Sequence, residues 1–173
     1  MGTHIILIGF MGAGKTTVGR CLSRQTSWPL FDTDQMIEKR AGMSISRIFE
    51  ARGEEVFRGL ETETIHSLMD REEDWVLSAG GGMPLREENR KLLREAGQVV
   101  YLKVNPGTVL HRLQGDTTRP LLAGGDVKKK VEDLLNCRGP IYESAAHIII
   151  KADDRQPEDI AEEIMVAVRA HLL

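Results

Sequence analysis

Short apolar runs rich in β-branched residues recur along the chain, separated by longer stretches with the spacing of amphipathic helices. The apolar runs predict five strands, at 4–8, 30–31, 75–79, 99–104 and 147–151. The stretches between them predict helices at about 15–26, 34–41, 44–72 (broken near Gly53), 86–96, 106–114, 126–145 and 157–172. Strands that alternate with helices favour a parallel sheet with right-handed crossovers and helices on both faces.

Ligands of such sheets bind beyond the carboxyl ends of the strands, so the residues that follow each strand should carry the chemistry. The first strand runs into a glycine-rich loop, the second into Asp32-Thr33-Asp34, and the third into Gly80-Gly81-Gly82. The last strand runs into the polar segment 152–157. These segments are therefore the first places to look for functional residues.

Residues 9–16, Gly-Phe-Met-Gly-Ala-Gly-Lys-Thr, match the phosphate-binding pattern G-x-x-x-x-G-K-[ST]. An apolar strand precedes them and a helical pattern follows, which is the context that this motif requires. The glycines let successive N–H groups point at phosphate oxygens, and the following helix adds its N-terminal partial charge. Lys15 can reach the β- and γ-phosphates, and the Thr16 hydroxyl can ligate Mg²⁺. We expect a nucleotide here, bound by Gly12, Ala13, Gly14, Lys15, Thr16 and Thr17.

Asp32 and Asp34 alternate, which directs their side chains similarly if the strand continues through them. One carboxylate can hold the hydration shell of Mg²⁺ while the other accepts a hydrogen bond from a substrate hydroxyl. The metal-binding Asp of many phosphate-loop proteins closes a later strand, but neither 75–79 nor 99–104 ends in one, so Asp32 is the candidate. The alternative is that one of the two caps the helix that begins near Gln35.

Arg58 and Glu61 lie three residues apart on a predicted amphipathic helix, so they are neighbours on its surface. A solvated surface pair is one interpretation. The other is that Glu61 fixes the Arg58 guanidinium so that it can clamp an anionic group of a substrate. Spacing alone leaves both open.

Three consecutive glycines, Gly80–Gly82, follow the third strand directly. A tight turn needs one or two, so the run suggests close approach of a ligand to bare backbone, with N–H groups as donors. Glycines also bound the segment 115–125, which contains Arg119 and has no helical periodicity. This segment predicts a mobile lid over the phosphates, with an ordinary surface loop as the alternative. Arg138, in helical register, can point toward the same cleft.

At 173 residues the chain is most simply one domain, with 41% hydrophobic and 28% charged residues. Its net charge of −3 and its lack of a long Lys/Arg run disfavour nucleic-acid binding. The two cysteines lie far apart and form no metal or redox motif, which suits a reducing cytoplasm. We expect no signal peptide, because the chain enters a strand almost at once, and no apolar run is long enough for a membrane span. A cytoplasmic monomer is the expectation.

The ordered motifs resemble those of the shikimate kinase family over almost the whole chain. The likeness rests on residues 9–16, Asp32-Thr-Asp34, Gly53-Glu-Glu-Val-Phe-Arg58-Gly-Leu-Glu61, Gly80-Gly-Gly82, Arg119-Pro-Leu-Leu and Arg138-Gly-Pro-Ile-Tyr142. The phosphate loop alone is common to many activities, whereas Phe-Arg-x-x-Glu followed by a triple glycine and Arg-Pro-Leu-Leu is far more specific. Two departures are visible: Thr16 stands where serine is frequent, and Arg47 where many members carry an acidic residue.

The resemblance implies an α/β fold of the P-loop, nucleoside-monophosphate-kinase type. Its three layers contain a five-stranded parallel sheet of order 2-3-1-4-5, with helices on both faces and a mobile lid. It implies a single domain over 1–173, with a substrate-binding helical region at about 33–61 and the lid at about 115–125. The implied reaction is transfer of the γ-phosphoryl group of ATP to the 3-hydroxyl of shikimate, in aromatic amino acid biosynthesis, with Mg²⁺.

The same likeness implies roles for individual residues. Lys15, Asp34 and Arg119 are catalytic, Arg119 is also the lid arginine that contacts ATP, and Thr16 and Asp32 hold the metal ion. The substrate contacts are Asp34, Arg58, Glu61, Gly80, Gly81, Gly82 and Arg138, with the arginines reading the carboxylate. The adenine pocket contains Arg112, Arg155 and Pro157.

Other functions of the same architecture stay open at this stage. A gluconate kinase also needs a carboxylate clamp, although the Phe-Arg-x-x-Glu and triple-glycine pair argues against it, and a nucleoside monophosphate kinase is the other near rival. A GTPase switch should contain Asn-Lys-x-Asp for guanine, and this sequence does not. A non-catalytic regulator should have lost Lys15, an Asp or Arg119, and all of these are present.

Overall fold

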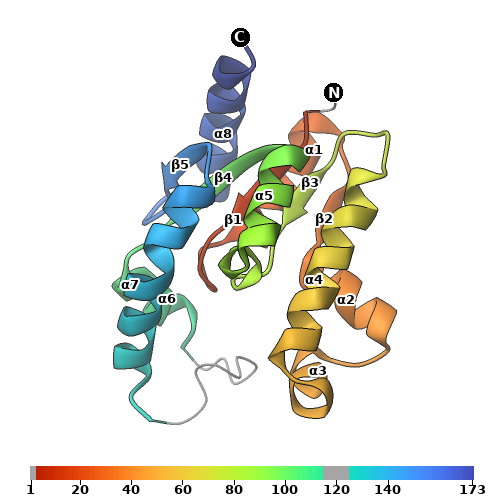
Figure 1. The fold of residues 1–173 in the computed structure, drawn as a ribbon. Coiled ribbons are helices and arrows are strands. Elements are labelled where there is room, and N and C mark those ends of the chain that lie inside the picture. The colour runs from red at the N-terminus through yellow and green to blue at the C-terminus, as the bar shows by residue number, and fades with distance from the viewer. Residues whose placement is uncertain (1–2, 115–124) are drawn as a thin grey trace.

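Five parallel strands pair in the order β2-β3-β1-β4-β5 in the computed structural model, which describes residues 3–114 and 125–173 (Figure 1). The strands are β1 Ile5–Ile8, β2 Leu30–Asp32, β3 Val76–Ser78, β4 Gln98–Lys103 and β5 Ile148–Lys151. The predicted fold class and strand order are therefore confirmed. Residues 115–124, which include Arg119 and nearly all of the predicted lid, lie outside the described residues.

Helices fill the connections, with boundaries close to those that the periodicity predicts. They are α1 Lys15–Thr26, α2 Thr33–Ala41, α3 Ile45–Arg52, α4 Glu54–Met69, α5 Glu87–Ala96, α6 Pro106–Arg112, α7 Val127–Ala145 and α8 Pro157–His171, with a 3-10 turn, η1, at Met83–Leu85. The predicted break near Gly53 is confirmed. Gly53 separates α3 from α4 with a φ of +83°, a value that glycine adopts without a Cβ clash.

Helices cover both faces of the sheet (Figure 1). On one face α1 packs against α8 and against β2 and β3. On the other face α5 and α7 contact β4, and α4 packs beside α5. Because the strands are parallel, their carboxyl ends meet at one edge of the sheet, where the loops after β1, β2 and β3 come together.

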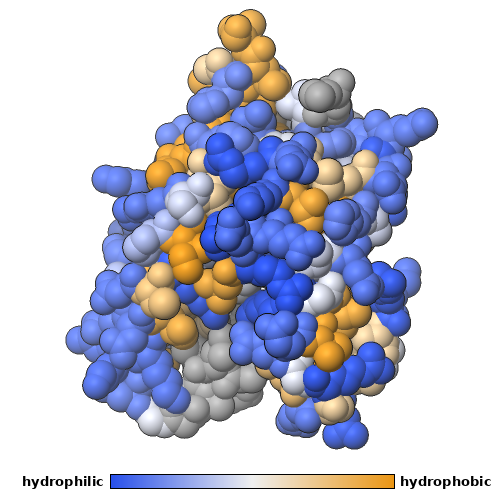
Figure 2. Space-filling view, in the orientation of Figure 1, coloured by the Kyte–Doolittle hydropathy of each residue, from blue (hydrophilic) through white to orange (hydrophobic). Residues whose placement is uncertain are grey.

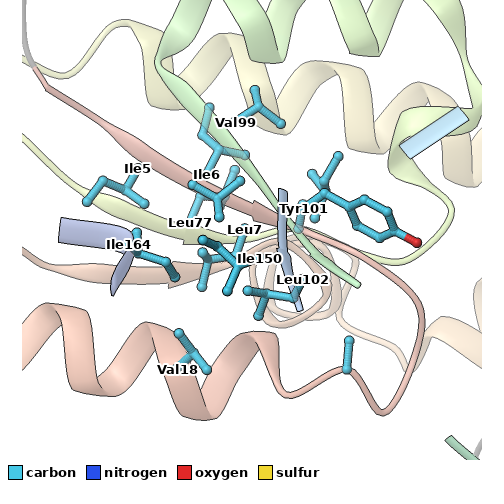
Figure 3. Close-up of a cluster of buried hydrophobic side chains, with 14 of the residues drawn as sticks. Ile5, Ile6, Leu7, Val18, Leu77, Val99, Tyr101, Leu102, Ile150 and Ile164 are labelled. Atoms are coloured by element: carbon cyan, nitrogen blue, oxygen red, sulfur yellow. The ribbon is translucent and has the colours of Figure 1, made fainter. Parts of the chain in front are cut away.

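The main hydrophobic core lies between the sheet and these helices. Every residue of β1 and β3 is buried, because both faces of these inner strands are covered. Figure 3 shows Val99 and Tyr101 of β4 on one side of the sheet, with Val18 of α1 and Ile164 of α8 on the other. Val99 and Tyr101 share a side because side chains of a strand repeat every two residues.

A second, smaller apolar cluster lies among α2, α3 and α4. Its buried members are Ile37, Ile48 and Phe57, one from each of these helices. It falls within the predicted substrate-binding region, 33–61. This region therefore has apolar packing of its own beside the main core.

The surface seen in Figure 2 is mainly hydrophilic, with apolar side chains in small separate patches. Apart from the two C-terminal leucines, the exposed large apolar side chains lie on separate helices and strands. They include Val56 on α4, Ile149 on β5 and Val166 on α8. None of the helices in the described part of the chain is both long enough and apolar enough to cross a lipid bilayer.

The edge strand β5 offers a matched pair of residues for testing the core. Ile150 is 3% exposed, whereas its neighbour Ile149 is 48% exposed. Ile150→Ala should lower the free energy of unfolding by about 2–5 kcal/mol, through lost burial and the cavity left behind. Ile149→Ala should lower it by about 1 kcal/mol or less. Urea unfolding followed by circular dichroism measures both changes, and equal losses would contradict the packing described.

Candidate active site

The loop between β1 and α1 has the backbone conformation that its sequence predicts. Gly9, Gly12 and Gly14 take φ values of +150°, +78° and +91°. A Cβ would disfavour all three values, and they let the chain curl around a phosphate group. The Lys15 ammonium donates hydrogen bonds to the carbonyls of Gly9 (2.9 Å) and Phe10 (3.0 Å). Lys15 therefore folds back over the loop.

A cavity of about 350 Å³ opens on this loop at the carboxyl ends of β2 and β3. Its lining combines predicted phosphate-binding residues with residues of the strand ends: Met11, Gly12, Gly14, Lys15, Thr16, Thr17, Asp32, Asp34, Gln35, Ser78, Ala79, Gly80 and Gly81. Ala13, the remaining residue of the predicted phosphate-binding set, is buried and does not line the cavity.

Three oxygen-bearing side chains of this lining lie together. The Thr16 hydroxyl is 3.0 Å from Asp32 Oδ2 and 3.0 Å from the Ser78 hydroxyl. The described residues contain no group of three or more His, Cys, Asp or Glu that could hold a metal ion by itself. The arrangement nevertheless fits Mg²⁺, which keeps several waters and takes one or two protein oxygens together with phosphate oxygens.

The strand does not continue through Asp32 and Asp34, so the condition for similarly directed side chains is not met, and the alternative that one of them caps the following helix is confirmed. β2 ends at Asp32, whose side chain accepts a hydrogen bond from the Gln35 backbone N–H (3.2 Å) and caps α2. Asp34 consequently lies in the first turn of that helix. Both aspartates still line the cavity, and Asp32 combines its capping bond with the contact to Thr16.

A second cavity, of about 90 Å³, adjoins the first, and four residues line both: Met11, Asp34, Gly80 and Gly81. The rest of its lining is three apolar side chains, Ile45, Phe49 and Phe57, and three charged ones, Arg58, Glu61 and Arg138, together with Gly82. All of the residues predicted to contact the substrate are thus brought together around one cavity, from α2, α4, α7 and the turn after β3.

Arg58 and Glu61 form a buried ion pair at this cavity. Arg58 Nη1 donates to Glu61 Oε1 at 2.6 Å, and Nη2 donates to Glu54 Oε1 at 3.3 Å. Arg58 is 7% exposed and Glu61 is fully buried, so the alternative of a solvated surface pair is excluded. The guanidinium also lies over the Phe57 ring, 5.2 Å from its centroid. These contacts fix the orientation of the guanidinium.

Burial raises the pKa of the Glu61 carboxyl to about 7, although the charge of Arg58 and its hydrogen bond act in the opposite direction. Asp34 adds to the increase in pKa, and Arg138 opposes it. Glu61 Oε2 is buried with no hydrogen-bond partner among the described residues. The carboxyl therefore changes its protonation state close to neutral pH.

The triple glycine makes room for these charged side chains. A Cβ on Gly82 would lie 2.6 Å from the guanidinium carbon of Arg58, and a Cβ on Gly80 would lie 2.8 Å from Asp34 Oδ1. Both distances are far below van der Waals contact. Gly80, Gly81 and Gly82 are not among the glycines with positive φ. Space, rather than backbone conformation, therefore requires glycine at 80 and 82.

A third cavity, of about 540 Å³, lies at the starts of α6 and α8. It is lined by Asn105, Gly107, Thr108, His111, Arg112, Asp154, Arg155 and Gln156. Arg112 connects it to the phosphate loop, because Arg112 Nη1 donates to the Gly12 carbonyl at 2.8 Å. Pro157, predicted beside Arg112 and Arg155, begins α8 one residue past this lining.

The site also contains three residues to which the sequence pattern assigns no role: Thr33, Ser78 and Met11. Thr33 Oγ1 accepts a hydrogen bond from the Gly80 N–H at 2.8 Å and so ties the glycine turn to α2. The sequence does give one indication that Ser78 has a function, because its hydroxyl lies inside an otherwise apolar strand. Nothing in the residue type or spacing distinguishes Met11.

Comparisons with known proteins agree with this geometry. A family model described as shikimate kinase matches residues 11–169. A shikimate kinase of Marinomonas sp. is 42% identical over 170 residues, which cover 98% of this chain and 93% of that protein. A shikimate kinase of Burkholderia thailandensis is 49% identical over 148 residues, which cover 86% of this chain and 80% of that protein.

Solved structures show the same likeness. A shikimate kinase from Acinetobacter baumannii in complex with shikimate has a TM-score of 0.94 at 38% identity, covering 100% of this chain and 96% of that one. A gluconokinase from Sinorhizobium meliloti has a TM-score of 0.58 at 13% identity, covering 97% and 92%, and shows a shared fold alone. The motifs, the fold and these matches together show that the chain belongs to the shikimate kinase family.

Proposed function

We propose that the chain transfers the γ-phosphoryl group of ATP to the 3-hydroxyl of shikimate, which gives shikimate 3-phosphate and ADP. The observation that carries this proposal is the pair of adjoining cavities. The first lies on the phosphate loop, the second contains two arginines, and Met11, Asp34, Gly80 and Gly81 line both. A phosphate in one cavity and a hydroxyl in the other would meet at this shared lining.

The second cavity suits a small ring that carries a carboxylate and several hydroxyls. Arg58 and Arg138 provide guanidinium groups, which can bind a carboxylate through two parallel hydrogen bonds. Asp34 provides an acceptor for hydroxyls, and Ile45 and Phe49 provide an apolar wall. The solved Acinetobacter baumannii relative contains shikimate, a molecule of this chemistry.

Phosphoryl transfer needs positioning and charge neutralisation more than covalent chemistry from the protein. The shikimate oxygen bonds to the γ-phosphorus while the bond from that phosphorus to the bridging oxygen of ADP breaks. Asp34, which borders both cavities, accepts the proton that the hydroxyl releases. Lys15 exchanges its loop carbonyls for phosphate oxygens and neutralises part of their charge. Thr16 and Asp32 would hold Mg²⁺, which would supply further positive charge at the phosphates.

The third cavity is proposed to hold the adenine ring. Arg112 and Arg155 line it, and the contact of Arg112 with the Gly12 carbonyl connects it to the phosphate loop. Arg119 keeps its predicted role as the lid arginine, on the grounds of the sequence. Because one chain supplies every contact in this scheme, a monomer is sufficient for activity.

The proposal predicts that ADP release requires shikimate and a divalent cation. An assay of ADP with ATP and Mg²⁺ present should show turnover with shikimate and at most weak turnover with gluconate or a nucleoside monophosphate. A chelator in excess should abolish the turnover with shikimate. Equal or faster reaction with either alternative acceptor would refute the assignment.

The buried guanidinium at position 58 predicts that lysine cannot replace arginine there. Arg58→Lys and Arg58→Ala should both lower kcat/KM for shikimate by roughly 10- to 150-fold, because a charged hydrogen bond is worth about 1.5–3 kcal/mol. Arg47→Ala is the control, because the Arg47 side chain is exposed on α3 and its ion pair, at 3.9 Å, is with the equally exposed Glu50. Steady-state kinetics measure kcat/KM for shikimate in all three variants. Full activity of Arg58→Lys would contradict the prediction and show that Arg58 acts only as a point charge.

The raised pKa of Glu61 predicts a pH-dependent stability. A carboxyl with a pKa of about 7 in the folded state and 4.5 in a free side chain contributes its full stabilisation below pH 4.5. That stabilisation is lost as the pH rises to about 7. Glu61→Gln does not ionise, so its stability relative to the unsubstituted chain should rise across this window, by at most about 3 kcal/mol.

Denaturant unfolding at several pH values between about 4.5 and 8 measures this difference. Glu63→Gln is the control for the loss of a carboxylate as such, because Glu63 lies on the same helix with its side chain 56% exposed. A stability difference between Glu61→Gln and the unsubstituted chain that stays constant with pH would contradict the raised pKa.

A further inference from the structure

Tyr142 makes contacts that the proposed mechanism does not use. It closes the sequence Arg138-Gly-Pro-Ile-Tyr142, in which only Arg138 has a proposed role. Tyr142 is fully buried on α7, four residues and so about one helical turn after Arg138. Its hydroxyl donates a hydrogen bond of 2.5 Å to the carbonyl of Gly81.

This hydrogen bond holds the middle peptide of the glycine turn. The carbonyls of Gly80 and Gly82 accept hydrogen bonds from backbone N–H groups of the adjacent turn η1, at 3.0 and 3.1 Å. The Gly81 carbonyl instead accepts from a side chain 61 positions away in the sequence. Consecutive glycines have wide backbone freedom. A specific contact is therefore needed to keep this peptide in one orientation.

The orientation matters because a peptide unit is planar. The described part of the chain has no cis peptide bonds, so the Gly81 carbonyl and the Gly82 N–H point in opposite directions from the same plane. By holding the carbonyl, Tyr142 also fixes the direction of the Gly82 N–H. Gly81 and Gly82 both line the second cavity.

The same hydroxyl interacts with Arg138. Burial raises the pKa of Tyr142, and the charge of Arg138 partly offsets that increase. The hydroxyl therefore stays protonated at neutral pH and can donate to the Gly81 carbonyl.

We propose that Tyr142 is a positioning residue for the acceptor substrate. Through its hydroxyl it orients the Gly81–Gly82 peptide, and so sets the geometry in which the acceptor is held. The inference rests on the proposed function for the identity of the acceptor. It assigns Tyr142 no contact with ATP, since Tyr142 lines neither the first nor the third cavity.

Tyr142→Phe tests this role, because it removes only the hydroxyl. The Gly81 carbonyl loses its donor, so kcat/KM for shikimate should fall about 5- to 100-fold, while KM for ATP stays within about twofold. Tyr101→Phe is the matched control. Tyr101 is 2% exposed and its ring centroid lies 5.2 Å from that of Tyr142, but its hydroxyl makes none of the hydrogen bonds of the glycine turn. It should retain kcat/KM for shikimate within about twofold.

Equal losses for shikimate and ATP, or equal effects of Tyr142→Phe and Tyr101→Phe, would make Tyr142 a core residue and overturn the proposal. A second measurement does not depend on catalysis: in protein labelled with ¹⁵N-glycine, the Gly82 amide resonance should shift or broaden in Tyr142→Phe and keep its position in Tyr101→Phe. An unchanged Gly82 resonance in Tyr142→Phe would also overturn the proposal. If the unsubstituted chain releases no ADP with shikimate, the proposed function is wrong, and the Gly82 resonance still decides whether Tyr142 orients this peptide.

Discussion

The space left by the missing side chains of Gly80 and Gly82 is the constraint on which the candidate site depends. Asp34 and Arg58 come from different helices, and both can line the second cavity because the backbone after β3 has no side chain at the two positions that lie against them. The pairing of β3 with β1 sets Ser78 opposite Leu7, so the glycine turn leaves the sheet beside the phosphate loop. A side chain at 80 would press on Asp34, which lines both cavities, and a side chain at 82 would press on Arg58 in the second cavity.

The features that the sequence predicts well are those that depend on near neighbours. The phosphate loop is specified by residues 9–16 and its flanks, and its positive φ values follow from glycine at the required positions. Gly53 ends one helix and precedes the next for the same local reason. The alternation of strands and helices likewise leads to the parallel sheet and to the edge at which the functional residues gather.

The features that the sequence misses depend on residues far apart in the chain. A spacing of three places Arg58 beside Glu61 but does not show whether the pair faces water or protein, and burial decides its chemistry. The side chain of Asp32 ends β2 by capping α2, which moves Asp34 off the strand. Three consecutive isoleucines, 148–150, resemble a fully buried strand, yet Ile149 is exposed because β5 lies at the edge of the sheet. No sequence pattern shows that the Tyr142 hydroxyl meets the Gly81 carbonyl.

The separate apolar cluster of Ile37, Ile48 and Phe57 packs α2, α3 and α4 against one another on the acceptor side of the site. Ile37 lies on the helix that carries Asp34, and Ile48 lies on the helix that carries Phe49, while neither isoleucine lines the first or the second cavity. The packing of these two side chains therefore sets where two parts of the cavity wall lie. A substitution at either isoleucine changes the shape of the acceptor cavity from outside it.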